Sequence, residues 1–531
     1  MGEVTGRRTT AEAGPTPEAG AASEAAPTGP DAGDDGVEIW DQLGRRGSQA
    51  ALQLGVRSLV LRGLTFLGTI ALARLLAPAD FGVYGVISFV VALWTALGDF
   101  GLGAALVQQP VAPSRAQLRT VWTVQQGLAL AATAGIWLLA PALTGLVPGL
   151  PPDADAMLRV LSLGLILSSL RTLPTVMMER DLRFGPLAAA EVLQTLTFYA
   201  VAIALGIAGF GAWSFVLAGI GQLATAAAAV NLAWRRWPGV GIDHDALGKL
   251  SRFGIAYQAS VILVTLRDAP LPALVALVSG TAAAGLIQFA LRVALTIASL
   301  DEVVARIAYP AFSRLQGFPD RQARAVAAAV MMTSLILVPA QCLLAALAPV
   351  IVPLVFGARW GDAILPLQLI SLATLLRYPA RYLRQAEFAR GDARLALAMT
   401  ALTTFLALGC FAAGLLLGGL PGSATGFALS ALLGLLGSAW LAGRTLTVGW
   451  RPFALALGAG IVAAAAGRMV LLLTAAATMD PAAAWVSAVV AGGVFTGVFG
   501  VLLLLTNRQM LAMGIRLAGR SVGRQGQPGR G

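Results

Sequence analysis

The chain has 531 residues, of which 57% are hydrophobic and 12% charged, and its formal net charge is +11. Soluble domains contain about 45–50% apolar and about 25% charged residues, so this composition excludes an ordinary soluble globular protein. It does not indicate a nucleic-acid partner either, because the arginines lie between long apolar segments and not along one helix face. The sequence therefore predicts an all-α polytopic membrane protein.

Residues 1–44 differ from the rest of the chain. They contain nine acidic and two basic residues, are rich in Ala, Gly, Pro, Thr and Glu, and have no apolar periodicity. Such a segment cannot bury enough apolar surface to offset the entropy lost on ordering, so we expect a disordered acidic tail. It also lacks the apolar core of a signal peptide and is not expected to be a secretory leader.

The remaining sequence predicts about fourteen transmembrane helices, because a helix needs about 20 apolar residues to cross the hydrocarbon layer. The predicted spans are 50–75, 82–107, 120–147, 156–178, 187–206, 211–233, 253–278, 283–305, 324–346, 362–385, 393–416, 421–442, 452–474 and 482–506. The predicted regions are an N-lobe of six spans (45–233), an inter-lobe loop (234–252), a C-lobe of six spans (253–442), two further helices (443–506) and a basic tail (507–531).

The distribution of basic residues predicts the orientation. With the amino terminus in the cytoplasm, the inward-facing segments carry 24 basic residues, whereas the outer loops carry only Arg359. Lys and Arg accumulate in cytoplasmic loops, so both termini are expected to be cytoplasmic.

A weak internal repeat accompanies this arrangement. The segment LRGLTFLGTIALARLLAPADFG (61–82) parallels LRDAPLPALVALVSGTAAAG (266–285), at a shift of about 203–205 residues. Each copy contains an arginine within the span, an apolar run, a break and a closing glycine, and each opens a six-span block. This pattern is typical of a transporter built from two similar bundles.

Several stretches resemble a known family. They are LARLLAPADFGVYG followed by GDFGLGAALVQ (72–108), MMERDLRFGPLAAAEVL (177–193), VARIAYPAFSRLQG (304–317) and LVFGARWGDAILPLQLISLATLLR (354–377). Together they resemble Wzx-type oligosaccharide flippases of the MOP transporter superfamily, in the branch described as lipopolysaccharide or polysaccharide biosynthesis proteins. The chain departs from the family in its seventh span, where Ala276-Leu277 stands at the place of a common Gly-Arg pair, and Ile287 replaces a common tyrosine.

The resemblance implies two six-helix lobes around a central cavity, with two C-terminal helices beside them. It also implies that the protein moves a polyprenyl-diphosphate-linked oligosaccharide across the bacterial cytoplasmic membrane by alternating access. The expected partners are this lipid-linked oligosaccharide, membrane lipids, and a glycan polymerase or glycosyltransferases of the same pathway. No cofactor, metal site or enzymatic activity is expected.

Arginines within the spans are the predicted substrate ligands. A charge in the hydrocarbon layer is costly and therefore faces water, protein or another charge. Arginine suits a diphosphate because its planar fork binds phosphate oxygens and stays charged. We predict that Arg62, Arg267 and Arg292 bind the diphosphate, with Arg57 as a weaker candidate that could instead snorkel to the surface. The alternative for all of them is internal ion pairing.

Two further features predict coupling or gating. Asp99 lies in an apolar span among glycines, where it could pair with an arginine such as Arg62 or serve as an ion-coupling site. Asp268 precedes Pro270 and Pro272, which remove two backbone donors and interrupt the helix. This break could move during transport or form a static kink.

Three other functions compete with the flippase. An enzyme of glycan assembly would need catalytic groups in large outer loops or a soluble domain, and the sequence has neither. A MATE-like small-molecule exporter of cationic compounds would favour an acidic cavity, whereas most ionisable residues within the spans are arginines. A non-transporting scaffold of a glycan assembly complex would use the acidic tail.

Overall fold

The structure is a computed structural model that describes residues 61–98, 102–103, 106, 112–181, 183–475 and 481–506. All regular elements within these ranges are helical, and eleven helices are long and apolar enough to cross a membrane. This confirms an all-α polytopic membrane protein. The predicted acidic tail, the basic tail from residue 507, Arg57 and Asp99 lie outside the described residues.

The helices follow one another with short connections, and residues 61–75 form the described part of the first one. The others are α2 (Pro78–Gly98), α4 (Arg115–Gly145), α5 (Ala154–Arg180), α6 (Phe184–Ile207), α7 (Trp213–Trp234), α8 (His244–Asp268), α9 (Leu271–Ala298), α10 (Asp301–Arg314), α11 (Pro319–Ile351), η1 (Val352–Phe356), η2 (Ala358–Ala363), α12 (Ile364–Ala389), α13 (Ala393–Ala442), α14 (Arg451–Ala475) and α15 (Pro481–Thr506).

Two of these helices contain glycines with non-helical backbone angles. In α9 this residue is Gly280, and in α13 the pair Gly418-Gly419 separates two helices that pack tightly against each other. These interruptions match the boundaries between predicted spans at 278–283 and 416–421. The number of fourteen spans stays a prediction, because most of the first one precedes residue 61.

The seventh and eighth predicted spans differ most from the structure. The predicted helix 253–278 is divided, because α8 ends at Asp268 and α9 begins at Leu271. Pro270 lacks a backbone N–H and cannot continue the helix. The predicted helix 283–305 is also divided, since α9 ends at Ala298 and α10 starts at Asp301.

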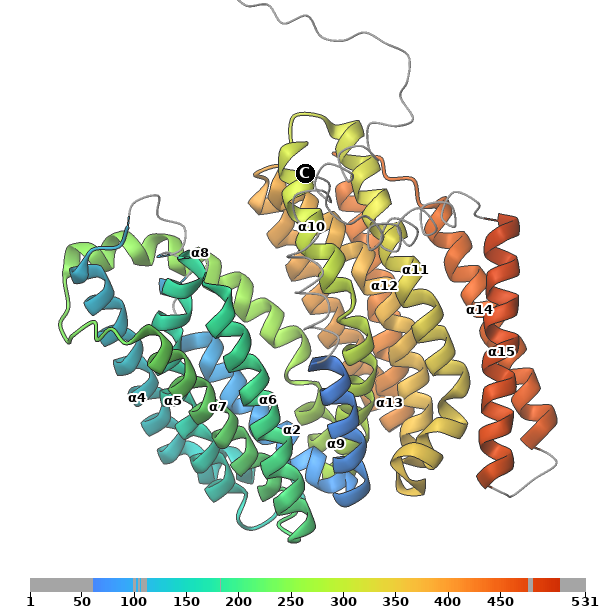
Figure 1. Cartoon of the computed structure of the whole chain (residues 1–531), viewed down its shortest axis with the longest axis horizontal. Coiled ribbons are helices and arrows are strands. Elements are labelled where there is room, and N and C mark those ends of the chain that lie inside the picture. Colours follow the sequence, from blue (N-terminus) through green and yellow to red (C-terminus); the bar gives the residue numbers. More distant parts are fainter. Residues whose placement is uncertain are drawn as a thin grey trace, which may run out of the picture.

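The helices form two groups joined at a seam (Figure 1). Helices α4–α7 pack together on one side, α10–α13 pack together on the other, and α14 and α15 lie against α11 at the far edge. The first helix, α2 and α9 run along the seam between the groups. Helix α8 bridges them, because it packs against α2 and α4 as well as against α13.

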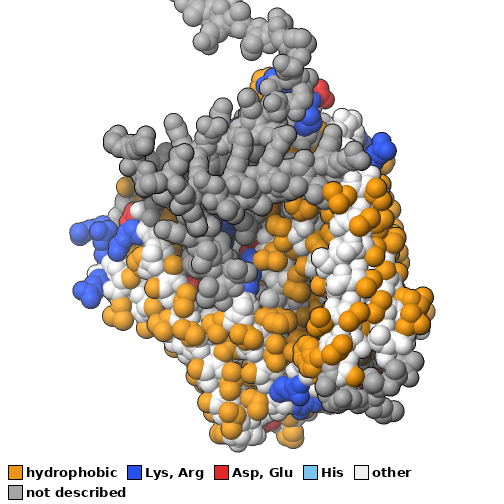
Figure 2. All heavy atoms as spheres, turned by 45° about the vertical axis from the view of Figure 1, so that its right-hand side comes forward, with side chains coloured by type: hydrophobic (Ala, Val, Ile, Leu, Met, Phe, Trp, Pro, Cys, Tyr) orange, Lys and Arg blue, Asp and Glu red, His pale blue; other side chains and the backbone are white. Residues whose placement is uncertain are grey.

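The surface fits a membrane environment. Figure 2 shows hydrophobic side chains over most of the described face beside α14 and α15, with lysine and arginine side chains mainly towards its margins. Large apolar residues are exposed on these helices, among them Leu473 at 71% and Val489 at 71%. Exposed apolar helix faces of this kind are stable in lipid and unfavourable in water.

At one end of the seam, α2 and α9 cross with their backbones in contact. A Cβ atom placed on Gly82 would lie 1.8 Å from the Thr281 carbonyl oxygen, and one on Gly285 would lie 1.7 Å from the Pro78 carbonyl oxygen. Each contact is the counterpart of the other at a shift of 203 residues, the shift of the sequence repeat. The repeat therefore meets itself at this crossing, and only glycine allows the helices to approach so closely.

Aromatic side chains fill the same end of the seam. Phe81 of α2 and Phe289 of α9 both contact Trp360 of η2, with ring centroids 5.0 and 4.4 Å apart, and all three are buried. The Trp360 indole N–H donates to the Ala73 carbonyl oxygen at 2.9 Å. The two helix groups are thus closed against each other here, and we call this the closed end of the seam.

Candidate functional site

A highly charged cavity lies on the C-lobe side, away from the closed end. It has a volume of about 310 Å³ and is lined by residues of α8 to α13. Four arginines and three carboxylates face it, and these residues are Arg267, Arg377, Arg381, Arg384, Asp268, Asp301 and Glu302. We call it the arginine cavity.

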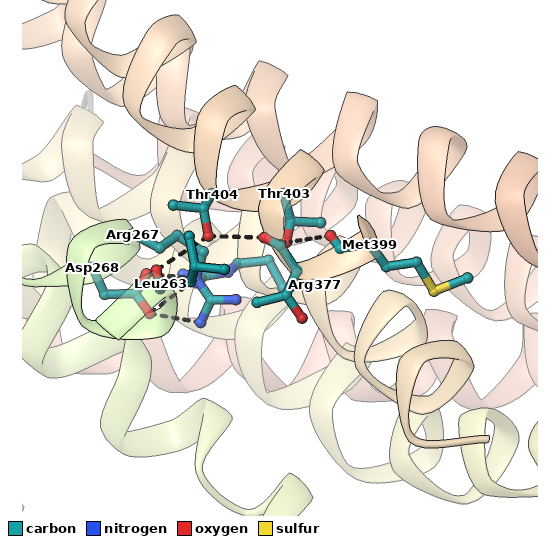
Figure 3. Close-up of polar contacts among 8 residues, drawn as sticks. Leu263, Arg267, Asp268, Arg377, Met399, Thr403 and Thr404 are labelled. Atoms are coloured by element: carbon teal, nitrogen blue, oxygen red, sulfur yellow. Dashed lines mark hydrogen bonds and ion pairs between the residues drawn. The ribbon is translucent and has the colours of Figure 1, made fainter. Parts of the chain in front are cut away.

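Asp268 joins two of these arginines (Figure 3). Its carboxylate accepts from the adjacent Arg267, with Nη2 to Oδ2 at 2.7 Å, and from Arg377 of α12, with Nη2 to Oδ1 at 2.6 Å. Asp268 is the last residue of α8, and Pro270 ends the helix directly after it. The predicted break is therefore present beside the pair, while its role in gating stays a prediction.

Helix α13 packs against α8 next to this charged pair. The Thr404 hydroxyl donates to the Leu263 carbonyl oxygen at 3.2 Å, which ties α13 to α8 one turn before the charged pair (Figure 3). The Arg377 guanidinium lies 5.2 Å from the Phe427 ring centroid, on the second half of α13. Ion pairing and cation–π contact together hold Arg377 between three helices.

A second carboxylate binds the next turn of α12. Asp301, the first residue of α10, is 5% exposed and accepts from Arg381 at 2.9 Å. It also accepts from the Tyr382 hydroxyl and, at 3.4 Å, from Thr333 of α11. A buried carboxylate is stable only with such partners, so this network fixes α10 against α11 and α12.

Arg62 of the N-terminal helix contacts one lining residue of this cavity. Its Nη2 lies 3.3 Å from Oε2 of Glu302, a cavity residue whose side chain is 50% exposed. The Nη1 atom of Arg62 is buried without a hydrogen-bond partner. Five arginines therefore surround three carboxylates where the first helix meets the C-lobe.

Arg292 has different surroundings from the other predicted ligands. It donates from Nη2 to the Tyr199 hydroxyl of α6 at 3.0 Å and lies 5.7 Å from the Phe198 ring centroid. It does not line the arginine cavity. The structure thus places Arg267 in the lining of the arginine cavity, joins Arg62 to the cavity through Glu302, and places Arg292 among aromatic side chains on the N-lobe side of the seam.

Sequence reasoning missed three residues of this site. Asp301 and Glu302 lie at the cytoplasmic end of the predicted span 283–305, and Arg384 is one of the 24 basic residues of the predicted inward-facing segments. A signal was present in the spacing of Arg377, Arg381 and Arg384, which repeats at four and three residues and predicts one helix face. Within the described residues, no group of three or more His, Cys, Asp or Glu side chains could hold a metal ion.

Comparisons with curated proteins identify related chains. The protein is 24% identical over 387 residues to the lipopolysaccharide biosynthesis protein WzxC of Escherichia coli (strain K12), an alignment that covers 71% of this chain and 76% of that protein. It is 25% identical over 315 residues to the succinoglycan biosynthesis transport protein ExoT of Rhizobium meliloti (strain 1021), which covers 59% of this chain and 63% of that protein.

Solved structures share the fold. The lipid II flippase MurJ in an inward closed conformation superposes with a TM-score of 0.69 at 13% identity, over 85% of this chain and 100% of that one. A multidrug resistance MATE family transporter of the MOP superfamily, in an inward-facing conformation, gives 0.57 at 16% identity, over 74% and 98%. Residues 71–365, more than half of the chain, match the family described as polysaccharide biosynthesis protein, and the protein belongs to that family.

Proposed function

We propose that the protein is a flippase that moves a polyprenyl-diphosphate-linked oligosaccharide across the cytoplasmic membrane by alternating access. The observation that carries this proposal is the excess of arginine at the arginine cavity, where four lining guanidinium groups, and a fifth from Arg62 paired with Glu302, meet three carboxylates. A charge imbalance within a helical bundle is costly unless an anion compensates it. The diphosphate of the lipid carrier is such an anion.

The geometry around Asp268 supports a diphosphate ligand. Its carboxylate is bound by two guanidinium groups from different helices, at 2.7 and 2.6 Å. Carboxylates and phosphates offer arginine similar pairs of acceptor oxygens. Asp268 therefore holds Arg267 and Arg377 in positions from which both could also bind phosphate oxygens. The phosphate could bind beside the Asp268 carboxylate or displace it from the two guanidinium groups.

The closed end of the seam supports alternating access. Gly82 and Gly285 hold α2 against α9 there, while the arginine cavity lies farther along the same bundle. In alternating access, two repeats rock around a central site. We infer that the backbone contact of the repeats closes one side and must separate when the cargo leaves.

The orientation proposed for the protein places the closed end at the outer leaflet. The loops at the opposite end, such as the one after α7 with Arg235 and Arg236, carry most of the basic residues. Both termini would then be cytoplasmic, and the cargo would enter from the leaflet where it is made. A polymerase or glycosyltransferases that supply and consume the glycan are the proposed protein partners.

The rival functions predict a different charge for the cavity or a different effect of removing the N-terminal tail. An exporter of cationic compounds would need a cavity with excess acid, and the arginine cavity has the opposite balance. A scaffold would not depend on the arginines of a buried cavity. It would instead lose glycan assembly when residues 1–44 are deleted, whereas a flippase would keep translocation.

The direct test is lipid translocation in proteoliposomes loaded with a polyprenyl-diphosphate oligosaccharide. Replacing Arg62 or Arg267 by Ala is expected to slow translocation by about 10–100-fold, since a hydrogen bond to a charged group contributes about 1.5–3 kcal/mol. The matched control is Arg394→Gln, which removes an exposed arginine at the start of α13. Equal rates for all three variants and the unmodified protein would refute the proposal.

A further inference from the structure

A second cavity lies on the other side of α8. It has a volume of about 510 Å³ and is enclosed by α2, α4, α5, α7 and α8. None of its lining residues is charged, in contrast to the arginine cavity. Most of the lining is apolar, and its polar members are Thr95, Gln125, Ser168, Ser169, Thr172, Gln258 and Thr265. We call it the neutral cavity.

Gln258 is a polar residue of this cavity that has an unpaired acceptor. Its side chain is 5% exposed, and its amide nitrogen donates to the Ala96 carbonyl oxygen. Its Oε1 atom is buried and accepts no hydrogen bond. An unpaired buried acceptor costs about 1–3 kcal/mol. A ligand that donates a hydrogen bond to Oε1 would remove this cost.

The neighbouring hydroxyl groups are also available as acceptors. Thr172 donates its proton to the Ser168 carbonyl oxygen at 3.0 Å, and Thr95 donates to the Val91 carbonyl oxygen at 2.8 Å. Because each hydroxyl proton is used within its own helix, the oxygen lone pairs remain for an incoming donor. The cavity thus offers several acceptors, no charge and the ring of Trp94. This combination fits a neutral polyol with one apolar face.

The two cavities share α8 as a wall. Gln258, Val261 and Thr265 lie at helical spacing on the face towards the neutral cavity, whereas Arg267 and Asp268 line the arginine cavity. Thr265 and Arg267 are two residues apart, about 3 Å along the helix axis. A diphosphate at the arginines would therefore lie at about the same depth as the neutral cavity, on the opposite face of α8.

We propose that the neutral cavity binds an uncharged sugar residue of the glycan attached to the diphosphate. This inference rests on the proposed function, because it places the glycan next to the diphosphate to which it is linked. A polyprenyl chain would fit the apolar lining but would leave Gln258 Oε1 unpaired. A sugar hydroxyl satisfies that oxygen while its ring packs on the apolar side chains and Trp94.

The test is binding of free sugars to the purified full-length chain, measured by saturation-transfer NMR. The probes are glucose, galactose, mannose, rhamnose and N-acetylglucosamine, with farnesol as the apolar competitor. At least one sugar is expected to bind the unmodified protein. Gln258→Met, which keeps the shape and removes the oxygen, and Thr172→Val should each weaken that binding at least about 10-fold, because a site built for a hydroxyl depends on its acceptors.

The control variant is Thr197→Val, which removes a similar back-bonded hydroxyl from α6, a helix that does not line the neutral cavity, and should leave sugar binding unchanged. Inorganic pyrophosphate, measured on the same samples, checks folding and separates the two proposals. Pyrophosphate binding without any sugar binding overturns the sugar site and leaves the proposed function intact. Farnesol that binds more tightly after Gln258→Met would also overturn it, since it assigns the cavity to the lipid chain.

Discussion

The two cavities flanking α8 are lined by different helices apart from α8 and have opposite chemistry. The arginine cavity is lined by seven charged side chains, whereas the neutral cavity is lined by none. The neutral cavity is the larger, at about 510 against about 310 Å³. A repeated fold therefore carries two different sites, and the proposed substrate has two matching parts, an anionic link and an uncharged glycan.

At the seam, by contrast, the two repeats make equivalent contacts. Gly82 lies against the Thr281 carbonyl as Gly285 lies against the Pro78 carbonyl. The two repeats are therefore similar where their backbones are in contact, and they differ where their side chains face a cavity. We infer that the closing motion belongs to the repeat, while selectivity belongs to each lobe separately.

The largest effect is expected at the seam. In Gly82→Val, the added Cβ would lie 1.8 Å from the Thr281 carbonyl oxygen. This clash prevents α2 and α9 from crossing as closely as they do at the closed end. Translocation should fall more than about 100-fold in proteoliposomes, since packing this tight cannot absorb added methyl groups. Gly409→Ala is the control, because its added Cβ would contact nothing within 4 Å. Normal transport by Gly82→Val would show that the crossing is not needed for function.

A smaller effect should distinguish the lobes by charge. Arg377→Gln removes a guanidinium bound to Asp268, and we expect translocation to slow by about 10–100-fold. Arg171→Gln removes an arginine of the N-lobe that donates to Gln194 at 2.9 Å and lines neither cavity. Its rate should stay within about 3-fold of the unmodified protein. Equal losses in the two variants would contradict the division of roles between the lobes.

Much of the fold could be predicted from the sequence because membrane helices are encoded locally. The length of apolar runs predicted most of the long helices, Pro270 marked the end of α8, and the repeat pointed to Gly82 and Gly285. The resemblance to oligosaccharide flippases, carried by four stretches, led to the family that the comparisons show. Each of these signals lies within a few neighbouring residues.

The site was predicted less completely because its contacts join distant segments. Asp301 is buried by Tyr382 and Thr333, 81 and 32 residues away in the sequence. Arg292, which has the same residue type and depth as Arg267, lies against Tyr199 of the other lobe. A helical pattern shows that such residues are within the membrane, but it does not show which neighbours they meet. The neutral cavity had no charge to mark it.

Asp268→Asn should sharpen the role of the carboxylates as counter-ions. The substitution keeps the shape and removes the charge that Arg267 and Arg377 now share. Inorganic pyrophosphate should bind about 3–10-fold more tightly, because it no longer competes with a carboxylate for the two guanidinium groups. Isothermal titration of the purified protein measures this. Weaker binding would instead mean that Asp268 positions the arginines for the ligand.

The smallest effect is expected from Trp360→Phe at the closed end. The substitution keeps an aromatic ring against Phe289 and removes the N–H that donates to Ala73. Because this hydrogen bond is buried, its loss should lower stability by about 1–2 kcal/mol, seen as a small decrease in the Tm of the purified protein. Trp485→Phe, at a side chain that is 49% exposed, is the control and should not shift Tm.

Pyrophosphate binding should be unchanged in both variants, because Trp360 lies at the seam that the two repeats share and not in the arginine cavity, which only one lobe contains. A loss of pyrophosphate binding in Trp360→Phe would show that closure and the arginine cavity are coupled, and that the two regions cannot be treated as separate.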